Sequence, residues 1–292
     1  MEKICIFTDS TSDLPHEQAE RWNIDIVPIQ IEANGKTYRE YYDITPQEYW
    51  KILLESEEIP QTSQIKMEDL LAQYKKAKDA GCTHCIGVII NGSGSGSGSY
   101  QTANIVRDMF YEECGKDMVI ELIDSESYAY MYGNVVIEGA KLREAGASFE
   151  EIVRTMRYSL KCMEAYLGVY SLRHLKKSGR ISGGTAFVGE ALGLRPISLV
   201  RAGSVDVCTK VRGDKNVVPK LVEMAKKEAV DPAGQTAYVV YAAVPEDQIA
   251  LAEKLMLEAG FGAVERYPIG MAVTTNAGPQ SIAVIFRGKP RD

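Results

Sequence analysis

The stretch "IGVIINGSGSGSGSYQTANIV", residues 86–106, decides between two very different organisations of this chain. Its centre alternates glycine and serine from Gly92 to Ser99, a composition that is typical of a flexible spacer between domains. However, a strand-like apolar run, Cys85 to Ile90, precedes it, and a segment with helical periodicity, Tyr100 to Cys114, follows it. A spacer here would interrupt a strand-to-helix connection, which needs a short loop. The pattern therefore predicts a functional loop inside an α/β fold.

The segments on either side of this loop alternate between strands and helices, which predicts βαβ units and a mainly parallel sheet. Thr45 with Pro46, and Ser148 with Glu151, mark the starts of two of the helices. The expected strands contain "KICIFTDS", "IDIVPIQIEAN" and "MVIELIDSESY". The expected helices contain "PHEQAERWN", "TPQEYWKILLES", "KMEDLLAQYKKAKDAG", "YGNVVIEGAKLREAG" and "SFEEIVRTMRYSLKCM".

The pattern changes after about residue 165, where strand-like segments outnumber helices. The two strand-like runs on either side of "RAGS" predict a hairpin with a short turn. We therefore expect an N-terminal parallel-sheet α/β domain at residues 1–163 and a second, α+β domain at residues 164–292. The expected strands here lie in "AYLGVYSL", "PISLVRAGSVDVCTKVR", "TAYVVYAAV" and "QSIAVIFRG", and the helices in "KNVVPKLVEMAKKEA" and "PEDQIALAEKLMLEAG".

The composition narrows the class of protein. The 292 residues are 45% hydrophobic and 25% charged, as in ordinary globular proteins. A formal net charge of -7 argues against a nucleic-acid partner, whose phosphates would be repelled. No run of 18 or more apolar residues occurs, so we expect no membrane span. The start "MEKICIFTDS" enters a strand pattern without a signal-peptide core, and the six scattered cysteines fit reduced thiols, so we expect a cytoplasmic protein.

One cysteine pair has the spacing of a metal or redox motif. Cys82 and Cys85 form a CxxC with His84 between them. No second CxxC or nearby histidine cluster completes a tetrahedral ligand set. We therefore interpret the pair as the end of a helix and the start of a buried strand, and we expect neither a metal nor a cofactor.

Polar clusters follow the predicted parallel strands at the ends where α/β sheets bind their ligands. These are the segment after Thr8, the Gly/Ser loop, and Asp124 with Ser125. A further cluster, Thr62 and Ser63, comes just before a helix, where unpaired N–H groups point outward. The site therefore looks suited to a small anionic or oxygen-rich group.

Within the loop, glycines let the backbone approach a ligand and serines add hydroxyl donors. We expect Ser99 to cap the following helix. We expect Ser93, Ser95 and Ser97 jointly to contact the ligand, and the sequence does not choose among them.

Seven motifs resemble those of the DegV family in the same order, namely "FTDSTSDLP", "PQTSQ", "GSGSYQTA", "DSESY", "LRHLKKSGRIS", "GLRPISLV" and "TKVRGDK". The resemblance covers nearly the whole chain. It implies two α/β domains with a long-chain fatty acid held between them and its carboxylate bound by hydroxyl groups. It also implies a lipid-binding protein without catalysis of its own, which in some members presents the fatty acid to a fatty acid kinase.

The resemblance also assigns residues to the head-group site. The family's motif threonine falls on Thr62, its motif serine on Ser97, which Gly98 follows, and its motif arginine on Arg180. Asn276 stands where the family commonly has a histidine. An asparagine can still donate a hydrogen bond to a carboxylate, but it carries no charge or mobile proton.

Two alternatives remain open from the sequence. Asp9 and Asp124, with the Gly/Ser loop, could serve phosphoryl or acyl transfer, although no Walker-type lysine follows the glycines and simple turn capping is the favoured interpretation. The other alternative is a divergent family member that binds a different apolar ligand. For a kinase partner, the basic segments "KKSGR" and "KVRGDK" are the candidate surface, with Arg173, Lys176, Lys210 and Arg212.

Overall fold

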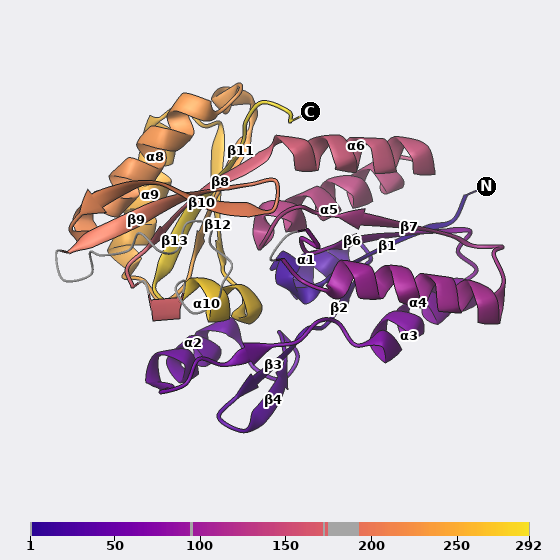
Figure 1. Ribbon diagram of the computed structural model, residues 1–292. Coiled ribbons are helices and arrows are strands. Elements are labelled where there is room, and N and C mark those ends of the chain that lie inside the picture. Colours follow the sequence, from indigo (N-terminus) through magenta and orange to yellow (C-terminus); the bar gives the residue numbers. More distant parts are fainter. Residues whose placement is uncertain (1, 94–95, 172, 175–192, 292) are drawn as a thin grey trace.

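The computed structural model describes residues 2–93, 96–171, 173–174 and 193–291. Its first sheet is parallel, with the order β2-β1-β6-β7, as the alternation of strands and helices predicts. Helices α3 and α4 cover one face of this sheet, and α5 and α6 cover the other (Figure 1). The elements are β1 (Ile4–Asp9), α1 (His16–Arg21), β2 (Ile24–Val27), α3 (Met67–Asp79), β6 (His84–Ile89), α4 (Ser99–Cys114), β7 (Val119–Asp124), α5 (Tyr130–Glu144) and α6 (Phe149–Cys162).

The second sheet is mixed, with the order β10-β9-β8-β13-β11-β12. All its neighbours are antiparallel except β11 and β12, which confirms the α+β character expected for this half. β9 and β10 form the predicted hairpin, with Ala202 and Gly203 at the turn. The elements are β8 (Met163–Val169), β9 (Leu194–Arg201), β10 (Ser204–Arg212), α8 (Val217–Glu228), β11 (Thr236–Tyr241), α9 (Glu246–Glu258), β12 (Ala263–Pro268), α10 (Met271–Ala277) and β13 (Ser281–Arg287).

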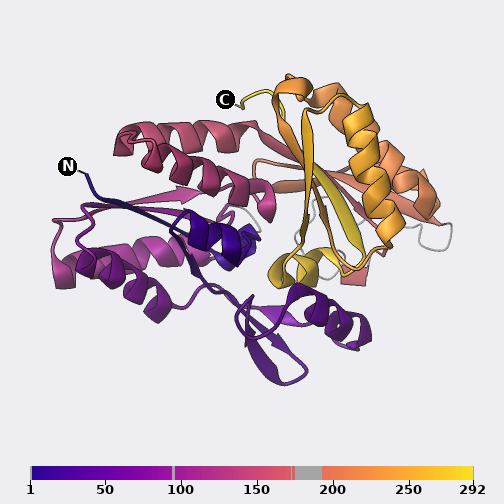
Figure 2. The same ribbon diagram turned by 180° about the vertical axis from the view of Figure 1, so that it is seen from behind.

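The expected single strand "IDIVPIQIEAN" is wrong, because it contains two strands that belong to different sheets. β2 ends at Val27, and Pro28, which has no N–H to donate, separates it from β3 (Gln30–Ala33). β3 pairs with β4 (Lys36–Arg39) and β5 (Gln61–Thr62) in a small antiparallel sheet. Helix α2 (Pro46–Glu55) lies beside this sheet and begins with the predicted Thr45 cap (Figure 2).

The two faces of the second sheet have different partners. Along β8, Tyr166 packs in a cluster with α8 and α9, whereas Ala165 belongs to the core shared with the first sheet. Along β13, Val284 and Ala283 divide in the same way, since successive side chains of a strand point to opposite faces. The face that carries Ala165 and Ala283 is therefore the one that looks toward the first half of the chain.

Candidate functional site

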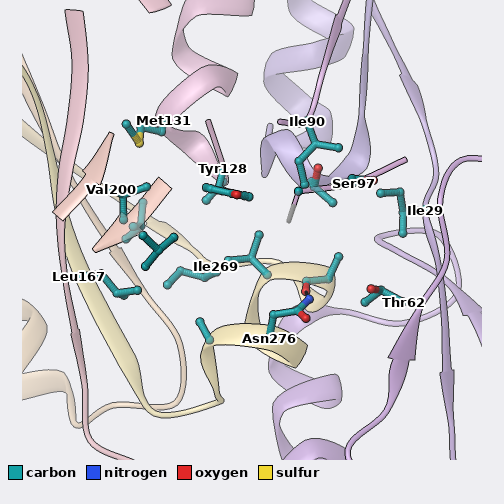
Figure 3. A pocket seen from close by; sticks show the side chains of 18 of the residues that line it. Ile29, Thr62, Ile90, Ser97, Tyr128, Met131, Leu167, Val200, Ile269 and Asn276 are labelled. Carbon is teal, nitrogen blue, oxygen red and sulfur yellow. Dashed lines mark hydrogen bonds between the residues drawn. The ribbon is translucent and has the colours of Figure 1, made fainter. Parts of the chain in front are cut away.

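A cavity of about 360 Å³ lies where the first half of the chain meets the face of the second sheet that carries Ala165 and Ala283 (Figure 3). Ligand pockets in proteins commonly span about 300–1,000 Å³, so this volume suits a small organic molecule. The lining residues are Thr11, Ile29, Thr62, Ser63, Gln64, Ile90, Gly96, Ser97, Gly98, Tyr128, Ala129, Met131, Ala165, Leu167, Val200, Val205, Val240, Ile269, Ala272, Val273, Asn276, Ala277, Ala283 and Ile285.

One end of the cavity is apolar. Figure 3 shows Leu167 and Val200 there, both from the second sheet, with Met131 from α5 beside them. Ala165 and Ala283 lie on neighbouring strands of the same face, and their small side chains leave the space that larger residues would fill. This end of the cavity offers aliphatic surface.

At the other end, polar groups from three separate segments lie beside two aliphatic side chains, Ile29 and Ile90 (Figure 3). Thr62 ends β5, Ser97 belongs to the Gly/Ser loop, and Asn276 belongs to α10, and Figure 3 shows them at the same end. Thr62 is half-buried and lines the cavity. The Asn276 amide donates to the Ala272 carbonyl at 2.8 Å. The structure thus brings together three residues that sequence motifs placed in the head-group site.

Ser63, Gly98 and Ser93 have different surroundings. Ser63 and Gly98 both line the cavity, although the Ser63 hydroxyl also donates to the Gln30 carbonyl at 3.3 Å. Ser93 is exposed, is not among the lining residues, and donates its hydroxyl to Asn91 at 2.8 Å. Ser95, Arg180 and Lys176 lie outside the described residues, so their contacts stay predictions.

The expectation that Ser99 caps α4 is wrong. Gly98 occupies the N-cap position without a side-chain cap, and Ser99 is the first helical residue. The Ser99 hydroxyl instead accepts the Ile65 N–H at 3.1 Å and the Ser97 hydroxyl at 2.9 Å. The contact with Ile65 spans 34 positions of the sequence, so Ser99 joins the Gly/Ser loop to the segment that follows Thr62.

Asn91 organises the loop, and sequence reasoning did not single it out. It is fully buried, and its amide donates to the Tyr128 hydroxyl at 2.7 Å and to the Gly203 carbonyl at 3.1 Å. Its backbone carbonyl accepts the Ser97 N–H at 2.7 Å. Gly203 has φ +73, and a Cβ there would collide with the Asn91 side chain. An asparagine directly after a buried strand and before glycines was the available signal.

Asp9 and Asp124 act as acceptors for nearby backbone groups. Asp9 is fully buried and accepts the Ile90 N–H at 2.7 Å and the Tyr132 hydroxyl at 2.8 Å. Burial raises the pKa of the Asp9 carboxyl above its usual value. Asp124 accepts the Gly92 N–H at 3.0 Å. Within their own turns, Asp9 accepts the Thr11 N–H at 2.9 Å and Asp124 accepts the Glu126 N–H at 3.0 Å. These two contacts match turn capping, the interpretation that the sequence favoured, and give no support to an acid–base role.

Two searches of the described residues concern metals and membranes. No group of three or more histidine, cysteine, aspartate or glutamate side chains in this part of the chain is arranged to hold a metal ion. None of the helices in the described ranges combines the length and the hydropathy that crossing a bilayer requires.

Comparisons with known proteins agree with the motifs over nearly the whole chain. The family model described as "Uncharacterised protein, DegV family" matches residues 3–289. A DegV domain-containing protein of Clostridium perfringens is 31% identical, covering 96% of this chain and 97% of that protein. A second one, of Caldanaerobacter subterraneus, is 30% identical and covers 99% of this chain and 100% of its own length.

Solved structures give the same result. A DegV family protein from Thermus thermophilus, described for its fatty acid binding, has a TM-score of 0.85 at 26% identity and covers 98% of this chain and 100% of its own. A fatty acid binding DegV family protein from Streptococcus agalactiae has a TM-score of 0.86 at 26% identity, with coverage of 99% and 100%. Sequence and fold together show that the chain belongs to the DegV family.

Proposed function

We propose that this protein binds one long-chain fatty acid in the cavity. The observation that carries the proposal is the division of the cavity into an end with hydroxyl and amide groups and an end with aliphatic side chains. The carboxylate lies near Thr62, Ser97 and Asn276, and the acyl chain runs along the second sheet toward Leu167 and Val200. The solved relatives from Thermus thermophilus and Streptococcus agalactiae, which are described as fatty acid binding, support this ligand class.

The affinity comes mainly from the acyl chain. Each CH₂ removed from water contributes ~0.8 kcal/mol, so a C16 chain could contribute roughly 11 kcal/mol before the costs of ordering it. Those costs take back much of the gain. The head group then needs only a few donors to set the orientation, and the hydroxyls of Thr62 and Ser97 are the proposed ones. The Ser97 hydroxyl has a single hydrogen, so on binding it would turn from the Ser99 oxygen to the carboxylate.

The remaining head-group assignments extend this proposal. Gly98 lets the loop backbone approach the carboxylate, and Ser63, which lines the cavity, offers a further hydroxyl. Ser95 lies outside the described residues and stays a proposed contact, whereas Ser93, which does not line the cavity, is not part of the proposed site. Arg180, which lies outside the described residues, supplies positive charge that keeps the fatty acid ionised.

Mass spectrometry of lipid extracted from natively purified protein tests the function. We expect one C14–C18 fatty acid for each protein chain. Protein that is free of lipid and does not take up added palmitate would overturn the proposal. A different apolar molecule at the same stoichiometry would replace the fatty acid as the ligand.

A further part of the proposal concerns the protein's cellular location and its partner. We place it in the cytoplasm, where a fatty acid kinase subunit would phosphorylate the bound acid. Lys210 and Arg212 are exposed on β10, an edge strand, and so are accessible to a partner. Replacing both by glutamate should slow phosphorylation by a cognate kinase without changing the lipid content. Unchanged kinetics over a range of salt concentrations would remove this surface from the proposal.

The proposed domain division puts residues 1–163 in one domain and 164–292 in the other. It is supported by the end of α6 at Cys162 and the start of β8, a strand of the second sheet, at Met163.

A further inference from the structure

A buried carboxyl group joins two walls of the cavity without lining it. Glu40 follows β4 and is 0% exposed. One of its oxygens, Oε2, accepts the Ser10 hydroxyl at 2.7 Å, and the other, Oε1, accepts the Ala272 N–H at 2.8 Å. Ser10 in turn accepts the Ile29 N–H at 2.9 Å. Because Ile29 and Ala272 both line the cavity, Glu40 connects the wall before β3 to the wall formed by α10.

The hydrogen-bond pattern fits an ionised Glu40. The Ser10 oxygen already accepts the Ile29 N–H, so its own hydrogen is available for Glu40. The Ala272 N–H also points at Glu40, so both carboxyl oxygens face donors. A proton on either oxygen would turn that oxygen into a donor, which would then face the Ser10 hydroxyl or the Ala272 N–H, each of which is also a donor. Protonation therefore weakens this connection.

Helix α10 depends on such external support. It has only seven residues, and Gly270 at its N-cap provides no side-chain cap. A helix this short is marginal by itself, and its first N–H groups need acceptors. The Ala272 and Met271 N–H groups lie against Glu40, and the Gly270 N–H lies against Asp13. The first half of the chain thus caps a helix of the second half.

The groups that face Glu40 are acidic or neutral. Asp9 and Asp13 interact with it electrostatically, and Tyr49 and Tyr41 are the neighbouring phenols. In the described part of the chain, no lysine, arginine or histidine forms an ion pair with Glu40 or Asp13. The Asp13 Oδ2 atom is buried and has no hydrogen-bond partner among these residues. Asp13 therefore keeps its proton more readily than Glu40.

We propose that Glu40 is a positioning residue of the cavity, whose ionised carboxylate holds α10 in place, so that fatty-acid affinity falls when Glu40 takes up a proton. The inference rests on the proposed fatty-acid binding and adds a means of regulating it. Ala272, Val273 and Asn276 of α10 line the cavity, so loosening the start of this helix moves part of the ligand's surroundings.

The Glu40 carboxyl gains and loses its proton near neutral pH. Burial raises the pKa of Glu40 to about 7. Burial and the charge of Glu40 raise the pKa of Asp13 well above its usual value. Because the folded-state pKa of Glu40 is raised, the stability that its protonated form contributes is complete below the unfolded-state pKa and is lost as pH rises through about 7. Folding and binding are therefore expected to respond to pH in opposite directions.

Titration of delipidated protein with dodecanoate, kept below its aggregation concentration, tests the inference at about pH 6 and about pH 8. We expect wild-type affinity to be about fivefold to tenfold weaker at the lower pH, the scale of one ordinary net hydrogen bond. Glu40→Gln, which resembles the protonated form, should show one low affinity at both values. Glu32→Gln, an exposed change on β3, is the matched control and should follow the wild type. The protonation of free dodecanoate at each pH is the same in the experiments on all three proteins.

Thermal unfolding of the lipid-free proteins adds a second readout. Relative to Glu40→Gln, the wild type should lose stability as pH rises from about 6 to about 8, while its affinity increases. A purely structural role would move stability and affinity together. Parallel affinity profiles in the wild type and Glu40→Gln would overturn the inference and leave fatty-acid binding intact. No binding by the wild type at either pH would overturn the proposed function itself.

A milder variant covers the case in which Glu40→Gln does not fold. Ser10→Ala removes a hydrogen bond that favours the ionised form of Glu40. The midpoint of the affinity profile should then move to higher pH. An unchanged midpoint would also overturn the inference.

Discussion

The two faces of the second sheet are built from alternate residues of the same strands. One, the filled face, packs against α8 and α9, and the other, the hollow face, lines the cavity. Along β13, Ile282, Val284 and Phe286 pack in the cluster that includes α8 and α9. Ala283 and Ile285, which lie between them, line the cavity. The side-chain volume on each face, rather than the backbone, therefore decides where a ligand can enter.

Because of this difference, we expect the filled face to govern mainly the free energy of unfolding and the hollow face to govern mainly the affinity for the ligand. On the filled face, burial and close packing hold the second half of the chain together. On the hollow face, small side chains such as Ala283 and Ala165 leave room for the cavity. Substitutions on the two faces should therefore change different measured quantities.

The largest effect is expected on the filled face. Phe286 is fully buried and stacks on Tyr166 with ring centroids 5.9 Å apart. Phe286→Ala should lower the free energy of unfolding by about 3–5 kcal/mol, because it leaves a cavity. Urea denaturation of lipid-free protein measures this. A loss below about 1 kcal/mol would mean that this face is not tightly packed.

On the hollow face, replacing a small side chain by a larger one should lower the affinity for the ligand. Ala283→Phe places a ring in the cavity and displaces about four CH₂ groups of the acyl chain, which is worth ~3 kcal/mol of binding free energy. The free energy of unfolding should change by less than about 1.5 kcal/mol, because the space is already there. Titration with palmitate and urea denaturation check the two numbers.

Leu257→Phe is the control for the added ring, because Leu257 is 53% exposed on α9. It should leave palmitate affinity unchanged. If Ala283→Phe binds palmitate as the wild type does, the acyl chain does not lie against this face.

The smallest of these effects concerns the polar end of the cavity. Replacing both Thr62 and Ser97 by alanine should weaken fatty-acid binding by at least ~2 kcal/mol, because two hydrogen bonds to a charged group are lost. Thr37→Ala, at an exposed position on β4, is the control and should have no effect. The head-group assignment is wrong if the double variant keeps the wild-type affinity.

Much of the fold could be predicted from local patterns. Thr45 is the N-cap of α2 with Pro46 in the first turn, as predicted, and Ser148 accepts the Glu151 N–H at the start of α6. The hairpin around Gly203 is also as expected. These features are carried by residues close in sequence, where cap and turn chemistry is legible.

Two elements of the second half, α10 and β12, were not predicted from the sequence. Helix α10 has the sequence "MAVTTNA", whose β-branched residues favour a helix poorly, and its capping carboxylate comes from Glu40, more than 200 positions away. β12 is an edge strand with several exposed residues, so it shows no clean alternation. Of the site, family motifs indicated Thr62, Ser97 and Asn276, whereas the aliphatic wall and Asn91 required the assembled fold.

The location and direction of the bound acyl chain test the central claim most directly. A crystal of the protein with ω-bromohexadecanoate, which carries bromine on its last carbon, would show that carbon by anomalous scattering. We expect one bromine peak beside Leu167 and Val200, with the carboxylate near Thr62, Ser97 and Asn276. A bromine peak at the Thr62 end, or outside the cavity, would contradict it.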